Sequence, residues 1–270
     1  MSIPLRSSLT ILVLMFVSAN THSQSDDNSQ GESFMDDVRI VTGASLGYTD
    51  YSFPAKLDHD LGFPSGGLTV AATRNRWQLA LNGSFSLKDA DVSEEEDVGD
   101  ASRQDIDLTL GYQINQSWSA FVGYKSGETK IEYMSREDED EGIAVSLNES
   151  YKEVGPYVGG AYSWQFEKAG RLTVSLAYAM LDATDEFRAN TDDDEPGEDP
   201  EFDDLTGRVT GDTTGFSYGL TWTMPLSGNL LFQTRFKMND YQQDITFEGD
   251  RYDDIDETFV SLLVGLAYVF

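Results

Sequence analysis

The last thirteen residues of the chain, Thr258–Phe270, alternate with a strict period of two. Successive side chains of a β-strand point to opposite faces, so this segment predicts a single strand. An apolar face of this length needs an apolar neighbour, which is either a protein core or lipid. That face carries Val260, Leu262, Val264, Leu266, Tyr268 and Phe270, and the other face carries Phe259, Ser261, Leu263, Gly265, Ala267 and Val269.

This closing strand resembles the C-terminal signature of Gram-negative outer-membrane β-barrel proteins. In that class, a terminal Phe and apolar residues at every second position are read by the assembly machinery. The resemblance implies that the barrel assembly machinery is a partner of this chain and that the outer membrane is its location. It indicates the class and no particular family within it. The implied assembly signal is Leu262, Val264, Leu266, Tyr268 and Phe270.

The first nineteen residues have the layout of a secretory signal peptide. A basic Arg6 precedes the apolar run 9–17, and Ser18 and Ala19 provide a small-residue exit. The run is shorter than the ~20 residues of a membrane-spanning helix. We therefore expect residues 1–19 to be a cleaved signal peptide, 20–37 a mobile acidic leader and 38–270 the barrel.

The acidic residues are concentrated in blocks between the alternating segments. The net charge of −30 would by itself suggest a soluble acidic protein, but it arises largely from these blocks. A nucleic-acid partner is not expected, because phosphate binding requires clustered Lys and Arg. The blocks are residues 94–97, 137–141, 192–195, 198–204 and 250–257.

The segments between the blocks predict about ten antiparallel strands, with eight or twelve as alternatives. Their connections alternate between short turns of Asn, Gly and Ser and long acidic loops. This alternation resembles an up-and-down outer-membrane barrel with short periplasmic turns and long external loops. The expected strands are 38–52, 66–74, 77–89, 104–114, 118–132, 151–166, 171–186, 213–226, 229–246 and 258–270.

All four tryptophans lie beside the expected short turns and share parity with the apolar face of their strands. Trp77, Trp118, Trp164 and Trp222 therefore predict an aromatic belt at the periplasmic interface, where amphipathic rings lie at headgroup depth. A soluble secreted barrel or sandwich is the alternative fold. It gives no reason to gather every Trp at one end.

The opposite strand faces are polar and small, and they predict the barrel lumen. Charged residues also occur with this inward parity. One interpretation is a salt-bridge network that holds the barrel together and blocks it, and the other is the selectivity lining of a narrow pathway. The candidate lumen-lining residues are Arg39, Asp105, Asp107, Lys125, Glu153, Arg235 and Lys237.

Catalytic chemistry finds little support in the sequence. The chain has two histidines, His22 at the signal-peptide boundary and His59 in the first long connection, and no cysteine. The ten-stranded omptin proteases use an Asp-His couple with the histidine late in the chain, and their motifs are absent. Lipid A deacylases and outer-membrane phospholipases also need a histidine base beside a serine. We therefore expect no catalytic residue and no cofactor.

Three functions remain open. The first is a non-enzymatic barrel, either a small pore that its acidic mouths would make cation-favouring or a structural membrane protein. The second is a surface adhesin or ligand-binding protein acting through long loops such as 195–204. The third, ranked last, is a rim hydrolase using His59. Expected partners are membrane lipids, lipopolysaccharide and divalent cations, which Asp192, Asp193, Asp194 and Glu195 could hold loosely.

Overall fold

The computed structural model describes residues 38–52, 60–92, 97–135, 145–167, 169–191, 206–247 and 250–270. The expected signal peptide, the acidic leader and His59 lie outside these ranges. Within them, no helix is long and apolar enough to cross a membrane. The elements are β1 (Arg39–Ser52), β2 (Asp60–Arg74), β3 (Trp77–Ser86), β4 (Ala90–Asp91), β5 (Asp97–Gln113), β6 (Trp118–Ser135), β7 (Val145–Phe166), β8 (Gly170–Thr191), β9 (Thr206–Ser227), β10 (Leu230–Phe247) and β11 (Asp250–Val269).

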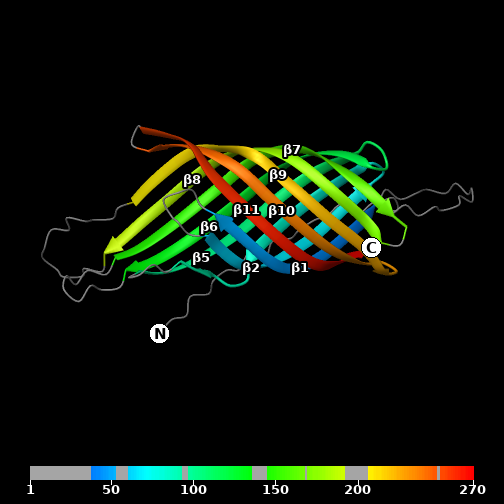
Figure 1. Ribbon diagram of the computed structural model, residues 1–270, viewed down its shortest axis with the longest axis horizontal. Helices are drawn as coiled ribbons and strands as arrows, with labels where there is room; N and C mark the ends of the chain where they lie inside the picture. The colour runs from blue at the N-terminus through cyan, green and yellow to red at the C-terminus, as the bar shows by residue number, and fades with distance from the viewer. Residues whose placement is uncertain are drawn as a thin grey trace, which may run out of the picture.

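Ten of these strands form a closed antiparallel barrel. Each pairs with its neighbour in the chain, the last strand β11 pairs with β1, and β3 pairs with β5 across the short β4. The β1–β11 seam runs without a break from Val41↔Val269 to Ser52↔Thr258. Figure 1 shows the strands inclined to the long axis of the barrel, with the C-terminus at one end. The expected all-β, up-and-down fold with ten strands is confirmed.

The two-residue strand β4 fills a gap in the barrel wall beyond the end of β3, on the side of the long connections. The strand β3 ends at Ser86, whereas β5 extends to Asp97 at the same end of the barrel. Near its N-terminal end, β5 instead pairs with β4, through Ala90↔Ala101 and Asp91↔Asp100. The sequence was expected to form a strand over 77–89 and then a long acidic connection, but β3 ends at Ser86 and the chain returns to the wall at β4, where Ala90 and Val92 are buried.

Most strands extend further toward the long connections than the sequence predicts. The block 250–257 was interpreted as an acidic connection, and this was wrong, because it lies in β11 and pairs with β10. Likewise β2 begins at Asp60, β5 at Asp97 and β7 at Val145. Period-two alternation marks a strand only where one face meets lipid or a core. Beyond the lipid, both faces tolerate polar residues, while the backbone hydrogen bonds of the wall continue.

The other ends of the strands are joined by short turns, as predicted. Asn75 adopts a φ of 54° between β2 and β3, and Gly228 a φ of 48° between β9 and β10. Asn and Gly tolerate this left-handed backbone conformation better than other residues. The Asn115 side chain accepts hydrogen bonds from the backbone N–H groups of Ser117 and Trp118, which fixes the turn between β5 and β6.

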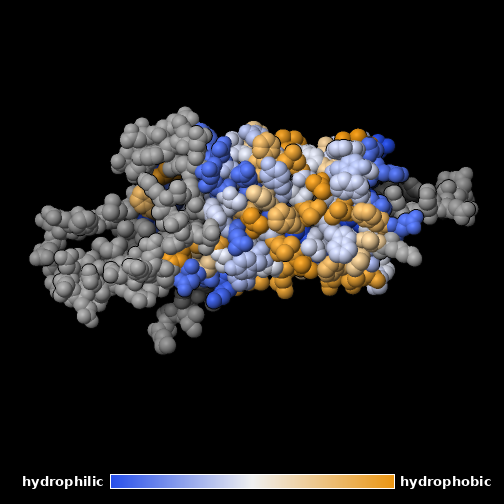
Figure 2. Space-filling model, viewed as in Figure 1, coloured by the Kyte–Doolittle hydropathy of each residue, from blue (hydrophilic) through white to orange (hydrophobic). Residues whose placement is uncertain are grey.

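An apolar belt surrounds the outer face of the barrel next to the short turns. Figure 2 shows these apolar side chains gathered over the wall, with hydrophilic residues on either side. On β11 the belt runs from Val260 to Phe270, about 34 Å along the strand. A tilt of about 40° reduces this to ~26 Å, close to the ~25 Å band of a transmembrane barrel. Its exposed members include Leu46, Tyr48, Leu79, Leu108, Leu110, Val122, Tyr124, Val158, Val174, Leu176, Tyr178, Phe216, Tyr218, Leu220, Leu262, Val264, Leu266 and Tyr268.

The four tryptophans lie on this outer face at the short-turn edge of the belt. Trp77 is 53% exposed and Trp222 is 38% exposed. Trp118 stacks edge-on against Tyr162, whose ring also contacts Trp164 at 4.6 Å between centroids. The indole N–H of Trp222 donates to the backbone carbonyl of Ala169. The Trp222 ring therefore presents apolar surface outward, while its N–H group bonds to the turn between β7 and β8.

Candidate functional site in the barrel lumen

Six of the seven charged residues proposed for the lumen point inward, and the structure divides them into two layers. Asp105, Lys125 and Glu153 belong to a polar layer near the outer edge of the belt. Asp107, Arg235 and Lys237 line a cavity closer to the short turns. The seventh, Arg39, is exposed at the short-turn end of β1 and lines neither layer.

The outer layer centres on Arg103 of β5, whose side chain is only 3% exposed. Its guanidinium donates to both carboxylate oxygens of Asp105, at 3.2 and 3.0 Å. It also donates to Thr129 Oγ1 at 3.0 Å and stacks over the Tyr51 ring at 4.3 Å. A bidentate pair that is also stacked holds this cation in one orientation.

Glu153 of β7 lies between the two buried cations of this layer. Its carboxylate is 3.7 Å from Arg103 Nη2 and 3.7 Å from Lys125 Nζ. Lys125 in turn donates to the Tyr241 hydroxyl at 3.2 Å, and that hydroxyl bonds to Ser217. These contacts join β5, β6, β7, β9 and β10 across the lumen.

A second group of bonds closes the remaining side of this layer. The Tyr151 hydroxyl of β7 donates to Glu257 of β11 at 3.1 Å. Gln243 of β10 donates to Tyr151 and to Thr213 of β9. The two groups of bonds thus reach across the barrel interior from most of its wall.

Apolar side chains pack around this network. Tyr51, Phe63 and Ile131 are at most 1% exposed, and Arg103 lies 5.0 Å from the ring of Phe259. We call the network and this core together the outer plug. Its apolar members are Tyr51, Leu61, Phe63, Ala90, Val92, Ala101, Ile131, Tyr151, Ala183 and Phe259.

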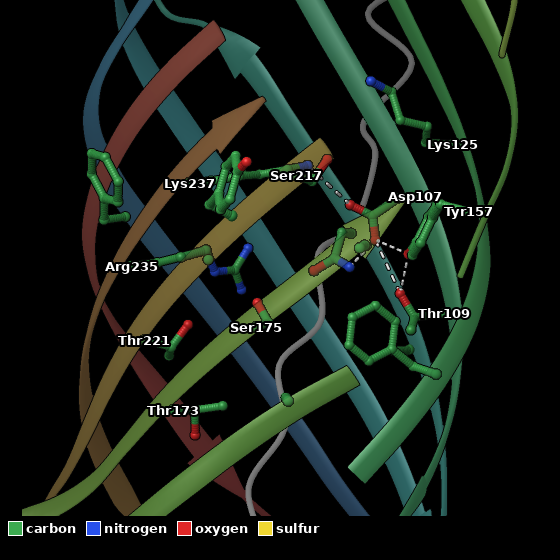
Figure 3. Close-up of a pocket in the computed structure, with 18 of the residues that line it drawn as sticks. Asp107, Thr109, Lys125, Tyr157, Thr173, Ser175, Ser217, Thr221, Arg235 and Lys237 are labelled. Atoms are coloured by element: carbon green, nitrogen blue, oxygen red, sulfur yellow. Dashed lines mark hydrogen bonds and ion pairs between the residues drawn. The ribbon is translucent and has the colours of Figure 1, made fainter. Parts of the chain in front are cut away.

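A cavity of about 190 Å³ lies next to the outer plug, on the side of the short turns, and we call it the mid-barrel cavity. Figure 3 shows Arg235 of β10 extending into it, toward Asp107 of β5 on the far wall. Lys125 and Tyr241 of the outer plug form part of its lining. The remaining walls combine the hydroxyl residues Thr109, Thr173, Ser175, Ser217 and Thr221 with Phe121, Ala80, Ala161 and Ala177.

Asp107 is held by neighbours on both sides. Its Oδ1 accepts from Asn82, from Thr109 at 3.3 Å and from the Tyr157 hydroxyl at 3.3 Å. Its Oδ2 lies 4.0 Å from Lys237 Nζ. Gly123 makes this possible, because a Cβ at this position would overlap the Tyr157 ring. Three donors therefore hold Oδ1, and a single ion pair holds Oδ2.

Arg235 contrasts with Asp107. In the described part of the chain, its guanidinium makes no hydrogen bond or ion pair, although it experiences the charge of Asp107 across the cavity. Five N–H donors thus face a space large enough for a ligand.

Sequence reasoning missed Arg103 and Glu257, because the strands were expected to begin at 104 and 258. Both share inward parity with residues that were named, Asp105 and Phe259. The tyrosines that bond the charges, Tyr51, Tyr151, Tyr157 and Tyr241, were missed as well. Extending the strands by parity into the flanking polar residues would have found Arg103 and Glu257, whereas the four tyrosines already lay at inward positions of the expected strands.

The expected divalent-cation site, Asp192 to Glu195, lies outside the described residues. Within the described ranges, no group of three or more His, Cys, Asp or Glu side chains could hold a metal ion. The assembly-signal residues Leu262, Val264, Leu266, Tyr268 and Phe270 are exposed on the outer face of β11 and just beyond it.

No protein-family model matches this chain, and no curated protein matches it. Solved structures that match are outer-membrane proteins. The outer membrane protease OmpT from Escherichia coli has a TM-score of 0.49 and 13% identity, over 88% of this chain and 98% of OmpT. The translocator domain of the autotransporter NalP from Neisseria meningitidis has a TM-score of 0.48 and 16% identity, over 91% and 90%. OprG from Pseudomonas aeruginosa has a TM-score of 0.32 and 12% identity, over 86% and 95%.

These proteins include a protease and a translocator domain. The expected resemblance to outer-membrane β-barrels is confirmed at the level of the barrel class.

Proposed function

We propose that this chain is a non-enzymatic outer-membrane barrel that is closed and acts as a structural surface protein rather than as an open diffusion pore. The outer plug carries this proposal. Buried Arg103 and Glu153 lie in the path that a solute would take, and ten apolar residues pack around them. The inward charges were interpreted either as a salt-bridge network that blocks the barrel or as the selectivity lining of a pathway. The outer plug supports the blocking network.

The energetics of the outer plug also favour a permanent closure. Removing water from two cations and several carboxylates is costly unless they are paired and hydrogen-bonded. Arg103 satisfies this condition through Asp105 and Thr129, and Lys125 through Glu153 and Tyr241. Among the described residues, Glu153 is held by its two ion pairs and by no hydrogen bond. Opening the lumen would require these contacts to break together.

The location that we propose is the Gram-negative outer membrane, reached with a cleaved signal peptide. The apolar belt and the tryptophans beside the short turns support it. In this orientation the short turns face the periplasm and the long strand ends face outward. The C-terminal face from Leu262 to Phe270 is available to the assembly machinery, and the outward acids could meet lipopolysaccharide through divalent cations.

Surface recognition is the second candidate function, and the length of the wall favours it. The strands β7, β8 and β9 have 22 residues each, far more than the 9–11 that cross a membrane. Beyond the belt, their outward residues are mixed in charge, such as Lys152, Glu186 and Arg208. A rigid wall that projects into solvent is a suitable support for recognition loops.

Planar-bilayer recording of the refolded mature protein tests closure. We expect no steady conductance from the parent chain. The double variant Arg103→Ala/Glu153→Ala should produce steady steps, because it removes the centre of the outer plug while its net charge is unchanged. The matched control Glu186→Gln/Arg208→Gln removes an exposed ion pair between β8 and β9 and should stay silent. Steady current through the parent protein would refute closure.

A further inference from the structure

A second property of the lumen is separate from closure and concerns the charges left in the mid-barrel cavity. Lys125 is neutralised by Glu153, and Lys237 approaches Asp107. Arg235 is the remaining cation, and its guanidinium makes no hydrogen bond or ion pair in the described part of the chain. A positive charge held among protein walls attracts small anions, since low-dielectric surroundings focus its field.

The cavity is large enough for more than solvent. A water molecule occupies about 10–15 Å³ of such space, so 190 Å³ holds about a dozen or more waters or one small organic molecule. The guanidinium of Arg235 presents a planar fork of donors that matches a carboxylate. Phe121, Ala161 and Ala177 provide an apolar surface for the rest of such a molecule.

Toward the short turns, the lumen contains a cluster of buried apolar side chains, Val41, Ala71, Ala80, Leu231 and Ala267. A smaller cavity of about 30 Å³ lies among the turns, and Thr173 lines both cavities. Arg76 and Arg171 line this smaller cavity, so its charged residues are cationic. At the other end, Lys125 and Tyr241 of the outer plug border the mid-barrel cavity. The outer plug therefore borders the cavity at that end.

We propose that the mid-barrel cavity binds a small organic carboxylate. Arg235 holds its carboxylate, Lys237 adds positive charge, and Phe121 with the alanines contacts its apolar body. This binding does not depend on conduction, and it predicts an anion-attracting lumen where the acidic mouths suggest a cation-favouring one.

The absence of cysteine from the chain permits a direct test. Ser175→Cys places one thiol in the cavity wall, and Asn229→Cys places a control thiol in the exposed turn after β9. Each is labelled with a sulfonate-bearing and a trimethylammonium-bearing methanethiosulfonate of similar size. The ratio of anionic to cationic rates should be about tenfold higher at position 175 than at 229. Adding Arg235→Gln should remove most of that preference.

Equal ratios at the two thiols would overturn the proposal, and so would a preference that survives Arg235→Gln. The comparison between the two single-thiol proteins needs no change at Arg235. It therefore remains decisive even if the Arg235→Gln variant fails to fold.

Calorimetric titration with benzoate then tests the ligand class. We expect saturable binding that weakens about tenfold or more in Arg235→Gln, and that is unchanged in Arg208→Gln, an equal loss of charge on the outer wall. Benzyl alcohol should not bind, because it lacks the carboxylate. If benzyl alcohol binds as tightly as benzoate, or inorganic phosphate competes equally well, the carboxylate proposal is wrong.

Discussion

The outer plug and the mid-barrel cavity contain the same kinds of side chain, yet their arginines differ in surroundings. Arg103 has a carboxylate two residues away on its own strand and a second on β7, and it stacks on Tyr51. Arg235 faces hydroxyls and open space, and the nearby carboxylate of Asp107 is already engaged. The difference indicates that a lumen cation becomes structural or available according to which acids its neighbouring strands supply.

The largest expected effect separates these two arginines by stability. Arg103→Met should lower the free energy of unfolding by about 3–5 kcal/mol, because it leaves half-buried Asp105 without its bidentate partner and buried Glu153 with Lys125 alone. Arg235→Met should change the free energy of unfolding by less than about 1 kcal/mol, since no hydrogen bond or ion pair is lost. Urea unfolding in detergent micelles, followed by tryptophan fluorescence, measures both.

Equal losses in the two variants would remove the distinction between the layers. Arg208→Met on the exposed wall gives the background effect of the substitution. A loss at Arg235 as large as that at Arg103 would mean that the mid-barrel cavity is also a structural core.

The sequence predicted the barrel well where lipid imposes alternation, and poorly beyond it. The belt of β11 and the tryptophan edge could be identified because one face must be apolar. The outer ends of β5, β7 and β11 could not, because water lies outside them and polar groups line part of the inside. Backbone pairing, which leaves no period in the sequence, extends these strands.

The lumen was predictable by parity but not by pairing. Asp105, Asp107 and Glu153 were correctly placed inward, but which cation each contacts depends on the register between strands. Lys125 is directly paired with Asp107 in the β5–β6 register, yet its side chain reaches Glu153 and Tyr241. Tilt and side-chain length decide such contacts, and neither can be read from a period of two.

A smaller effect is expected from Glu149, an inward residue of β7 that lies well beyond the apolar belt. Burial, and then the charge of Asp185, raise the pKa of Glu149 to about 7 from its usual value of 4.5. The folded state therefore binds this proton more tightly than the unfolded state. The stability that this tighter proton binding contributes is fully present below about pH 4.5, and it is lost as the pH rises through about 7.

Glu149→Gln should remove this loss. The variant should be more stable than the parent by about 1 kcal/mol at pH 8, after allowance for solvent screening, and similar to it near pH 4.5. Urea midpoints at the two pH values provide the measurement, and Glu132→Gln on the exposed face of β6 is the control. An equal difference at both pH values would show that Glu149 does not titrate in this window.

The smallest effect is expected for a solvent-exposed ion pair on the outer wall. Arg208 Nε is 3.6 Å from Glu186 Oε1, and both side chains are more than 60% exposed. In a double-mutant cycle of Glu186→Gln and Arg208→Gln, their coupling should be below about 0.5 kcal/mol and should vanish in 1 M salt. The Arg103–Glu153 pair, at a similar separation, should couple several-fold more strongly and resist salt. If the two pairs coupled equally, burial would not be what makes the outer plug structural, and the contrast with the mid-barrel cavity would need another cause.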